Sequence, residues 1–96
     1  MKIPKEFRII DTLYEVVHSS DLAECSGCLG QARYHEQRIY LQTPTKYYHK
    51  SEIEQVFWHE VLHCIFKKLG YDDLREDERF VDTVASCLNQ ILSTMK

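Results

Sequence analysis

His59, Glu60 and His63 form the motif HEVLH inside a long apolar segment, IEQVFWHEVLHCIFKKL. If this segment is helical, positions i and i+4 lie about 40° apart around the axis and about 6 Å apart along it. Two imidazoles placed in this way can bind one metal ion, with Zn–N distances of about 2.0–2.1 Å. Glu60 can then reach a water on the metal without being a ligand, as in the HExxH motif of zinc hydrolases. The motif therefore predicts a zinc site with Glu60 as the general base.

A third protein ligand is needed, because two histidines alone bind zinc weakly. We expect a second helix to fold back antiparallel after Gly70, with Glu78 about five residues, or ~7–8 Å, from its start. His63 lies ~10 Å from the end of its own helix, so Glu78 and His63 lie at a similar distance from the turn that joins the two helices. Asp82, one turn further on, comes level with His59. We predict Glu78 as the third ligand and Asp82 as the acceptor that orients His59 through its free ring nitrogen.

The alternative to a metal is that His59 and His63 are hydrogen-bonded core histidines and Glu60 a mid-helix carboxylate paired with a lysine. Each buried imidazole nitrogen then needs its own partner, whereas one cation satisfies several of these groups together. The cost of burial therefore favours metal binding. Zinc is the expected ion, although the same ligands also bind cobalt, nickel or manganese.

The elements that must position these residues follow from the hydrophobic pattern. The segment FRIIDTLYEVVHS predicts two short strands with a turn at Asp11-Thr12, and further strands are expected at about 29–34 and 38–42. The segment DLAECSGCLG between them predicts a loop. In the strand at 38–42, Ile39 and Leu41 alternate with polar residues, which indicates one buried face.

Two helices are expected in the second half of the chain. The first runs from about Ser51, as its cap, to Leu69, and Gly70 ends it. The second begins near Asp73, with Glu76 completing a variant of the capping box, and continues to the C-terminus. Its apolar residues form one stripe, which consists of Phe80, Val84, Cys87, Leu88, Ile91 and Met95.

Length and composition limit the chain to one domain, residues 1–96. Strands followed by helices predict an α+β fold: a small, mostly antiparallel sheet of three or four strands and a helical hairpin that carries the metal site. The net charge of −3 and the lack of a basic stripe argue against a nucleic-acid ligand. Residues 1–10 lack the apolar core of a secretory signal, and no segment is long enough to cross a membrane. We therefore expect an intracellular, cytoplasmic protein.

Cys25 and Cys28 form the sequence CSGC. This spacing is typical of half a zinc knuckle or of a redox pair, but a zinc knuckle needs two more ligands at similar spacing, and none follows. An incidental loop feature is the favoured interpretation. The role of the pair is open at this point.

The motif His59-Glu60-x-x-His63 followed by Glu78-x-x-x-Asp82 resembles the gluzincin branch of zinc metallopeptidases. The chain as a whole is similar to the very small single-domain forms found among phage and mobile-element proteins. The resemblance implies a zincin-like fold, a third zinc ligand on the following helix, and a sheet-edge strand that pairs with an extended peptide substrate. Residues 38–42 are our candidate for this strand. The asparagine common before the family's glutamate is Asp77 here.

The implied function is zinc-dependent hydrolysis of a peptide or protein substrate. Candidate donors for the oxyanion are Tyr47, Tyr48, His49, Tyr71 and His35, among which the sequence does not choose. One rival is a non-catalytic binding or regulatory module of phage or mobile-element origin, in which zinc stabilises a marginal core. A second rival is a structural domain without metal. The oligomeric state is open.

Overall fold

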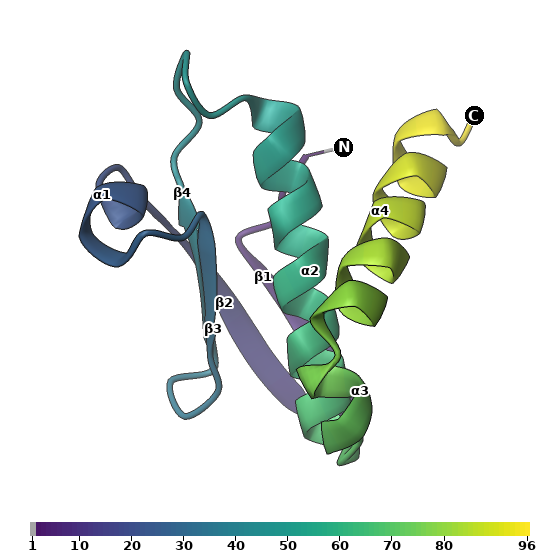
Figure 1. The fold of residues 1–96 in the computed structure, drawn as a ribbon. Helices are drawn as coiled ribbons and strands as arrows, with labels where there is room; N and C mark the ends of the chain where they lie inside the picture. The colour runs from purple at the N-terminus through teal and green to yellow at the C-terminus, as the bar shows by residue number, and fades with distance from the viewer. Residues whose placement is uncertain (1) are drawn as a thin grey trace.

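Helix α2 (Lys50–Leu69) lies at the centre of the computed structural model, which describes residues 2–96. The sheet packs against one side of this helix, and α4 (Glu78–Thr94) packs against another (Figure 1). Strands precede helices along the chain, which confirms the predicted α+β class. The histidine motif is therefore carried by the one helix that contacts both of the other layers.

The sheet contains β1 (Glu6–Ile9), β2 (Thr12–Ser19), β3 (Gly30–Arg33) and β4 (Arg38–Gln42), in the order β1-β2-β4-β3. The pairs β1–β2 and β3–β4 are antiparallel, whereas β2 and β4 are parallel. The sheet is thus mixed, with most pairings antiparallel as predicted. The predicted turn at Asp11-Thr12 lies one residue earlier, at residues 10–11.

The prediction that residues 38–42 form the exposed edge strand is wrong. β4 lies between β2 and β3, and β3 forms the edge of the sheet. The strand has a neighbour on each side, since β2 pairs with it in parallel and β3 pairs with it in antiparallel orientation, while Ile39 and Leu41, both 0% exposed, face the core. The second half of β2, which extends past β1, provides one of these neighbours.

The connection from β2 to β3 contains a short helix, α1 (Leu22–Ser26), where the sequence predicted only a loop. Its anchor is the buried side chain of Gln42, which is 2% exposed. The Gln42 side-chain oxygen accepts a hydrogen bond from the Ala23 N–H at 2.8 Å, and its amide donates to the Ser20 carbonyl at 2.9 Å. A polar residue at the end of β4 therefore fixes α1 on the sheet.

Helix α2 buries two of its sides. One side packs on the sheet in the main core, whose fully buried members include Ile39, Leu41, Ile53, Phe57 and Cys64. The other side contacts α4 through a smaller cluster of buried residues, Leu62, Val81 and Ala85. Trp58 and Ile65 are partly buried and contact both clusters. The predicted stripe on α4 is only partly correct, since Phe80, Ile91 and Met95 remain 38–67% exposed while Val81 and Ala85 make the central contact.

The helix boundaries correct three sequence-based expectations. The N-cap of α2 is His49, so Ser51 lies in the first turn rather than at the cap. Gly70 ends α2 in the left-handed region (φ 79°), as predicted. The expected single second helix is two helices, α3 (Asp72–Glu76) and α4, and Asp73 caps neither of them.

Asp77 separates α3 from α4 and is the N-cap of α4. Its carboxylate accepts a hydrogen bond from the Phe80 N–H at 3.0 Å. An aspartate that bonds the backbone in this way competes with a continuous helix, which explains the break. Glu78 is consequently the first residue of α4 and not a residue five positions inside a helix.

We expect Asp77→Ala to lower the free energy of unfolding by about 1 kcal/mol, because it removes the side-chain acceptor at the start of α4. Urea denaturation followed by far-UV circular dichroism measures this change. Asp73→Ala is the matched control: Asp73 lies in the first turn of α3 and is not a cap, so we expect a change within about 0.5 kcal/mol. Equal losses in the two variants would contradict the assignment of the cap.

Candidate metal centre

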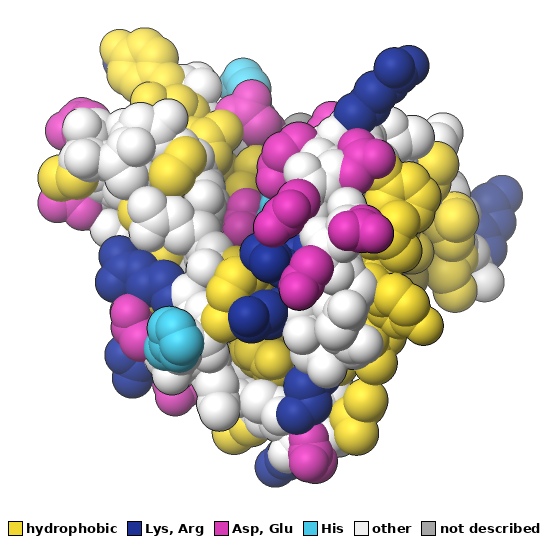
Figure 2. All heavy atoms as spheres, turned by 60° about the horizontal axis from the view of Figure 1, so that its bottom comes forward, with side chains coloured by type: hydrophobic (Ala, Val, Ile, Leu, Met, Phe, Trp, Pro, Cys, Tyr) yellow, Lys and Arg dark blue, Asp and Glu magenta, His cyan; other side chains and the backbone are white. Residues whose placement is uncertain are grey.

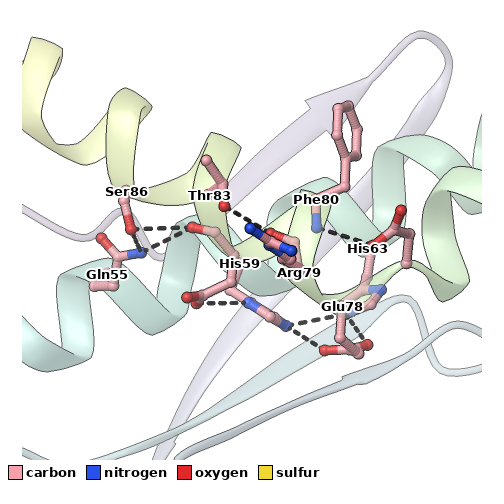
Figure 3. Close-up of polar contacts among 10 residues, drawn as sticks. Gln55, His59, His63, Glu78, Arg79, Phe80, Thr83 and Ser86 are labelled. Atoms are coloured by element: carbon pink, nitrogen blue, oxygen red, sulfur yellow. Dashed lines mark hydrogen bonds and ion pairs between the residues drawn. The ribbon is translucent and has the colours of Figure 1, made fainter.

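Three side chains from two helices converge at one point between α2 and α4 (Figure 3). Nε2 of His59 lies 3.1 Å from Nε2 of His63 and 3.0 Å from Oε2 of Glu78. Nε2 of His63 lies 3.1 Å from Oε1 of Glu78. The structure therefore brings together the three residues predicted as ligands, although Glu78 reaches the histidines from the first turn of α4.

The second ring nitrogen of His59 has an acidic neighbour. Nδ1 lies 3.4 Å from Oδ1 of Asp82, the residue predicted to orient this imidazole. A carboxylate in that position favours the proton on Nδ1, which leaves a lone pair on Nε2. That lone pair points toward a carboxylate oxygen of Glu78. Two acceptors do not bond to each other unless a proton or a cation lies between them.

His63 is also in an environment suited to a neutral ligand. Burial lowers the pKa of His63; the charge of Glu78 opposes this effect, and His59 adds to it. The imidazole of His63 also forms a hydrogen bond with the backbone of Arg75. Two imidazole nitrogens and a carboxylate within 4.8 Å of one another are the donor set of a divalent cation, above all zinc. The residues present therefore fit the predicted ion.

Glu60 remains outside this group of three and lies beside it. Burial raises the pKa of Glu60 to about 7; His59 lowers this pKa, Glu78 raises it, and a hydrogen bond from the backbone of Ala32 lowers it. A carboxyl group in the middle of a helix is ordinarily exposed and acidic. Glu60 instead lies in an environment that disfavours its charge, which is typical of functional sites.

His59 and Glu60 line a cleft of about 260 Å³ between β3, α2 and α4. Its lining comprises Cys28, Leu29, Gly30, Gln55, Val56, His59, Glu60 and Asp82. A larger hollow of about 690 Å³ lies over residues of α1, β2 and β3 and contains none of the predicted site residues. We assign the site to the smaller cleft because His59, Glu60 and Asp82 line it, and His63 and Glu78 contact His59 beside it. None of the five side chains considered as oxyanion donors lines it.

Gly30 allows β3 to lie against the motif. A Cβ atom at this position would lie 2.5 Å from Cγ1 of Val56 and 3.1 Å from Cγ of Glu60. A real Cβ does not approach another atom this closely, so only glycine fits. The sequence argument missed this role, because a glycine at the start of a strand has no pattern that points to the helix opposite.

Gln55 is a second residue that the sequence argument missed. Its amide donates a hydrogen bond to the Ser86 hydroxyl at 2.8 Å, and Ser86 in turn donates to the Asp82 carbonyl at 3.0 Å (Figure 3). This pair joins α2 to α4 one helical turn from His59. Gln55 lies four residues before His59, about one helical turn, and therefore on the same side of α2. This spacing was the available signal.

Cys25 and Cys28 are free, and only Cys28 lines the cleft. Among residues 2–96, the one group of three potential metal ligands within reach of each other is His59, His63 and Glu78. No protein-family model, curated protein or solved structure matches this chain. The interpretation of the site therefore depends on its own residues and geometry.

We expect the chain to bind one zinc ion and its melting temperature to rise on zinc addition, because the ion binds the folded state. Asp82→Asn should lower the affinity for zinc about 10–100-fold, because it removes the charge that orients His59. Glu78→Gln should lower the zinc affinity further. Glu76 is an exposed carboxylate two residues earlier, so Glu76→Gln should leave the zinc affinity unchanged. Competition with a chromogenic chelator measures the affinities. Equal zinc affinity in Glu78→Gln and Glu76→Gln would refute the ligand assignment.

Gly30→Ala should destabilise the protein by about 1–3 kcal/mol, because the new methyl group overlaps Val56. Val56→Ala in the same chain removes the overlapping Cγ1 atom. The double variant should therefore be more stable than the sum of the two single changes predicts, a coupling that urea denaturation of all four proteins measures. Strict additivity would contradict the close approach of β3 and α2.

Proposed function

We propose that this protein is a zinc-dependent peptidase, with His59, His63 and Glu78 as zinc ligands and Glu60 as the general base. One observation carries the proposal. The Nε2 atoms of His59 and His63 lie 3.1 Å apart, and each lies 3.0–3.1 Å from one carboxylate oxygen of Glu78, while Glu60 remains outside the ligand set and lines the cleft beside His59. A purely structural zinc site gains nothing from a half-buried carboxyl group next to its ligands.

A bound zinc ion would supply a Lewis acid and would lower the pKa of a water molecule toward about 7. The chain's own residues supply the rest. Glu60 accepts a proton from the water that attacks the peptide carbonyl and transfers it to the amine released when the C–N bond breaks. Asp82 holds His59 in one orientation through Nδ1, and the Arg75 backbone does the same for His63.

An extended peptide would bind along the free edge of β3, which replaces residues 38–42 as the candidate strand. The Leu29 carbonyl accepts a hydrogen bond from the Gln42 N–H. Along an antiparallel strand the backbone groups of successive residues point alternately toward and away from the partner strand, so those of Gly30 and Ala32 point away from β4. The Ala32 backbone already reaches Glu60 from that edge. Peptide main chain added there would lie beside the cleft that His59 and Glu60 line.

A second candidate is a binding module in which zinc is purely structural. One observation favours it: the fully buried contact of α4 with α2 consists only of Leu62, Val81 and Ala85. An ion bound by both helices would stabilise this small contact considerably. The two candidates share the zinc site and differ only in whether Glu60 has a chemical role.

The substrate is proposed to be a peptide or an unfolded protein segment, and nucleic acid is not expected. Within residues 2–96, no helix combines the length and the apolar character needed to span a bilayer. The cytoplasmic location stays a prediction from the sequence.

We expect Glu60→Gln to keep its zinc and its zinc-dependent rise in melting temperature, and to lose peptide hydrolysis by about 10²–10⁴-fold. A mixture of quenched-fluorescent peptides measures hydrolysis, and metal analysis measures zinc. The control is Glu52→Gln, an exposed glutamate in the first turn of the same helix, which should retain full activity. Zinc-loaded wild-type protein that cleaves none of the peptides, or a fully active Glu60→Gln variant, would favour the structural role.

A further inference from the structure

Helix α4 presents an apolar stripe beside its contact with α2. The exposed fractions are 38% for Phe80, 54% for Ile91 and 67% for Met95. Figure 2 shows hydrophobic side chains gathered on the right-hand flank of the molecule, the side on which α4 lies in Figure 1. The full stripe consists of Phe80, Val84, Cys87, Leu88, Ile91 and Met95.

The surroundings of this stripe lack charge. Residues 83–95, TVASCLNQILSTM, contain no Asp, Glu, Lys or Arg. A helix at the surface of a monomer normally carries charged residues on its outer side, whereas an uncharged helix is typically covered by protein. No like charges would therefore oppose each other if two copies of this segment came together.

The spacing of the stripe identifies a second copy as the occupant. In two antiparallel helices related by a two-fold axis, residues pair so that their numbers have a constant sum. With the axis between Cys87 and Leu88, these two residues face each other across the pair. Val84 then pairs with Ile91, and Phe80 lies opposite Met95, the C-cap residue that directly follows α4. The six positions thus keep the same spacing when the direction of the helix is reversed, which is the self-complementarity that an isologous dimer needs.

The exposed area is sufficient for a weak dimer. Phe80, Ile91, Met95 and Cys87 are exposed, whereas Val84 and Leu88 are partly buried against the contact with α2. Such a patch is small compared with specific interfaces, which bury about 1,200–2,000 Å² in total. The surface continues beyond α4, because Trp58 and Ile65 contact its core cluster and also line an apolar groove of about 440 Å³ beside β1. We therefore expect a weak dimer that forms only at high protein concentration.

The metal site lies on the other side of the helix. Ile91 is nine residues from Asp82, which places the two about 180° apart around the axis of α4. Glu78 and Asp82 contact the histidines of α2 from that opposite side. We infer that the protein forms a two-fold symmetric dimer through antiparallel packing of the α4 stripes, with both metal sites facing outward. This inference does not depend on the proposed enzymatic function.

The register can be tested through Cys87, which is exposed and lies next to the two-fold axis. In a Cys25→Ser/Cys28→Ser background, Cys87 is the accessible thiol, because Cys64 is only 1% exposed. We expect a short bismaleimide to crosslink two chains at protein concentrations near 100 µM. Adding Cys87→Ser should abolish the crosslinked product. A dimer that does not crosslink at Cys87 would overturn the antiparallel register.

The surface can be tested by sedimentation velocity from about 1 to 500 µM protein. Ile91→Glu would place like charges near the centre of the interface and should give a monomer at every concentration. Gln90→Glu, which adds the same charge on a different side of α4, should dimerise as the wild type does. Far-UV circular dichroism and zinc content, expected to be unchanged, show that the variants fold. A wild type that stays monomeric at 500 µM, or an Ile91→Glu variant that still dimerises, would overturn the inference.

Discussion

The contact of Leu62 with Val81 and Ala85 is the constraint on which the candidate site depends. These residues set the distance and the axial position of α4 against α2, and the small side chain of Ala85 lets the two helices approach closely. Once this register is fixed, Glu78 and Asp82 lie opposite the two histidines with no further adjustment. A shift of one residue along α4 would move both carboxylates about 100° around its axis and remove them from the site.

The sequence was sufficient for the parts of the fold that depend on local patterns. Helix α2, its end at Gly70 and the strands near their observed bounds follow from periodicity and from the conformational preference of glycine. The predicted site geometry was based on an incorrect helix start, however. Glu78 begins α4 and does not lie five residues into a helix. Glu78 nevertheless lies 3.0–3.1 Å from Nε2 of both histidines, and Asp82 lies 3.4 Å from Nδ1 of His59. The Asp77 cap was missed, since Asp73 has the same chemistry and a better capping-box spacing.

The errors on the sheet have a different origin. Strand order depends on contacts between distant segments, and alternation in residues 38–42 shows that one face is buried without showing how many neighbours the strand has. The free edge at β3 depends on Gly30, whose importance becomes visible only when Val56 and Glu60 lie opposite it. A residue whose contribution is the absence of a side chain has no signal in a single sequence.

Helix α4 has three chemically different sides, two of which contact α2, and their distribution around the helix explains its unusual composition. One side supplies a small apolar cluster to α2, a second side supplies Glu78, Asp82 and Ser86 to the polar contacts of the site, and the third carries the uncovered stripe. None of the three is large, because a chain of this length has little surface to bury. If α4 packed against a second chain through this stripe, that contact would hold the helix from the side opposite Glu78 and Asp82. The apolar cluster of Leu62, Val81 and Ala85 is small, so α4 would gain stability from such a contact.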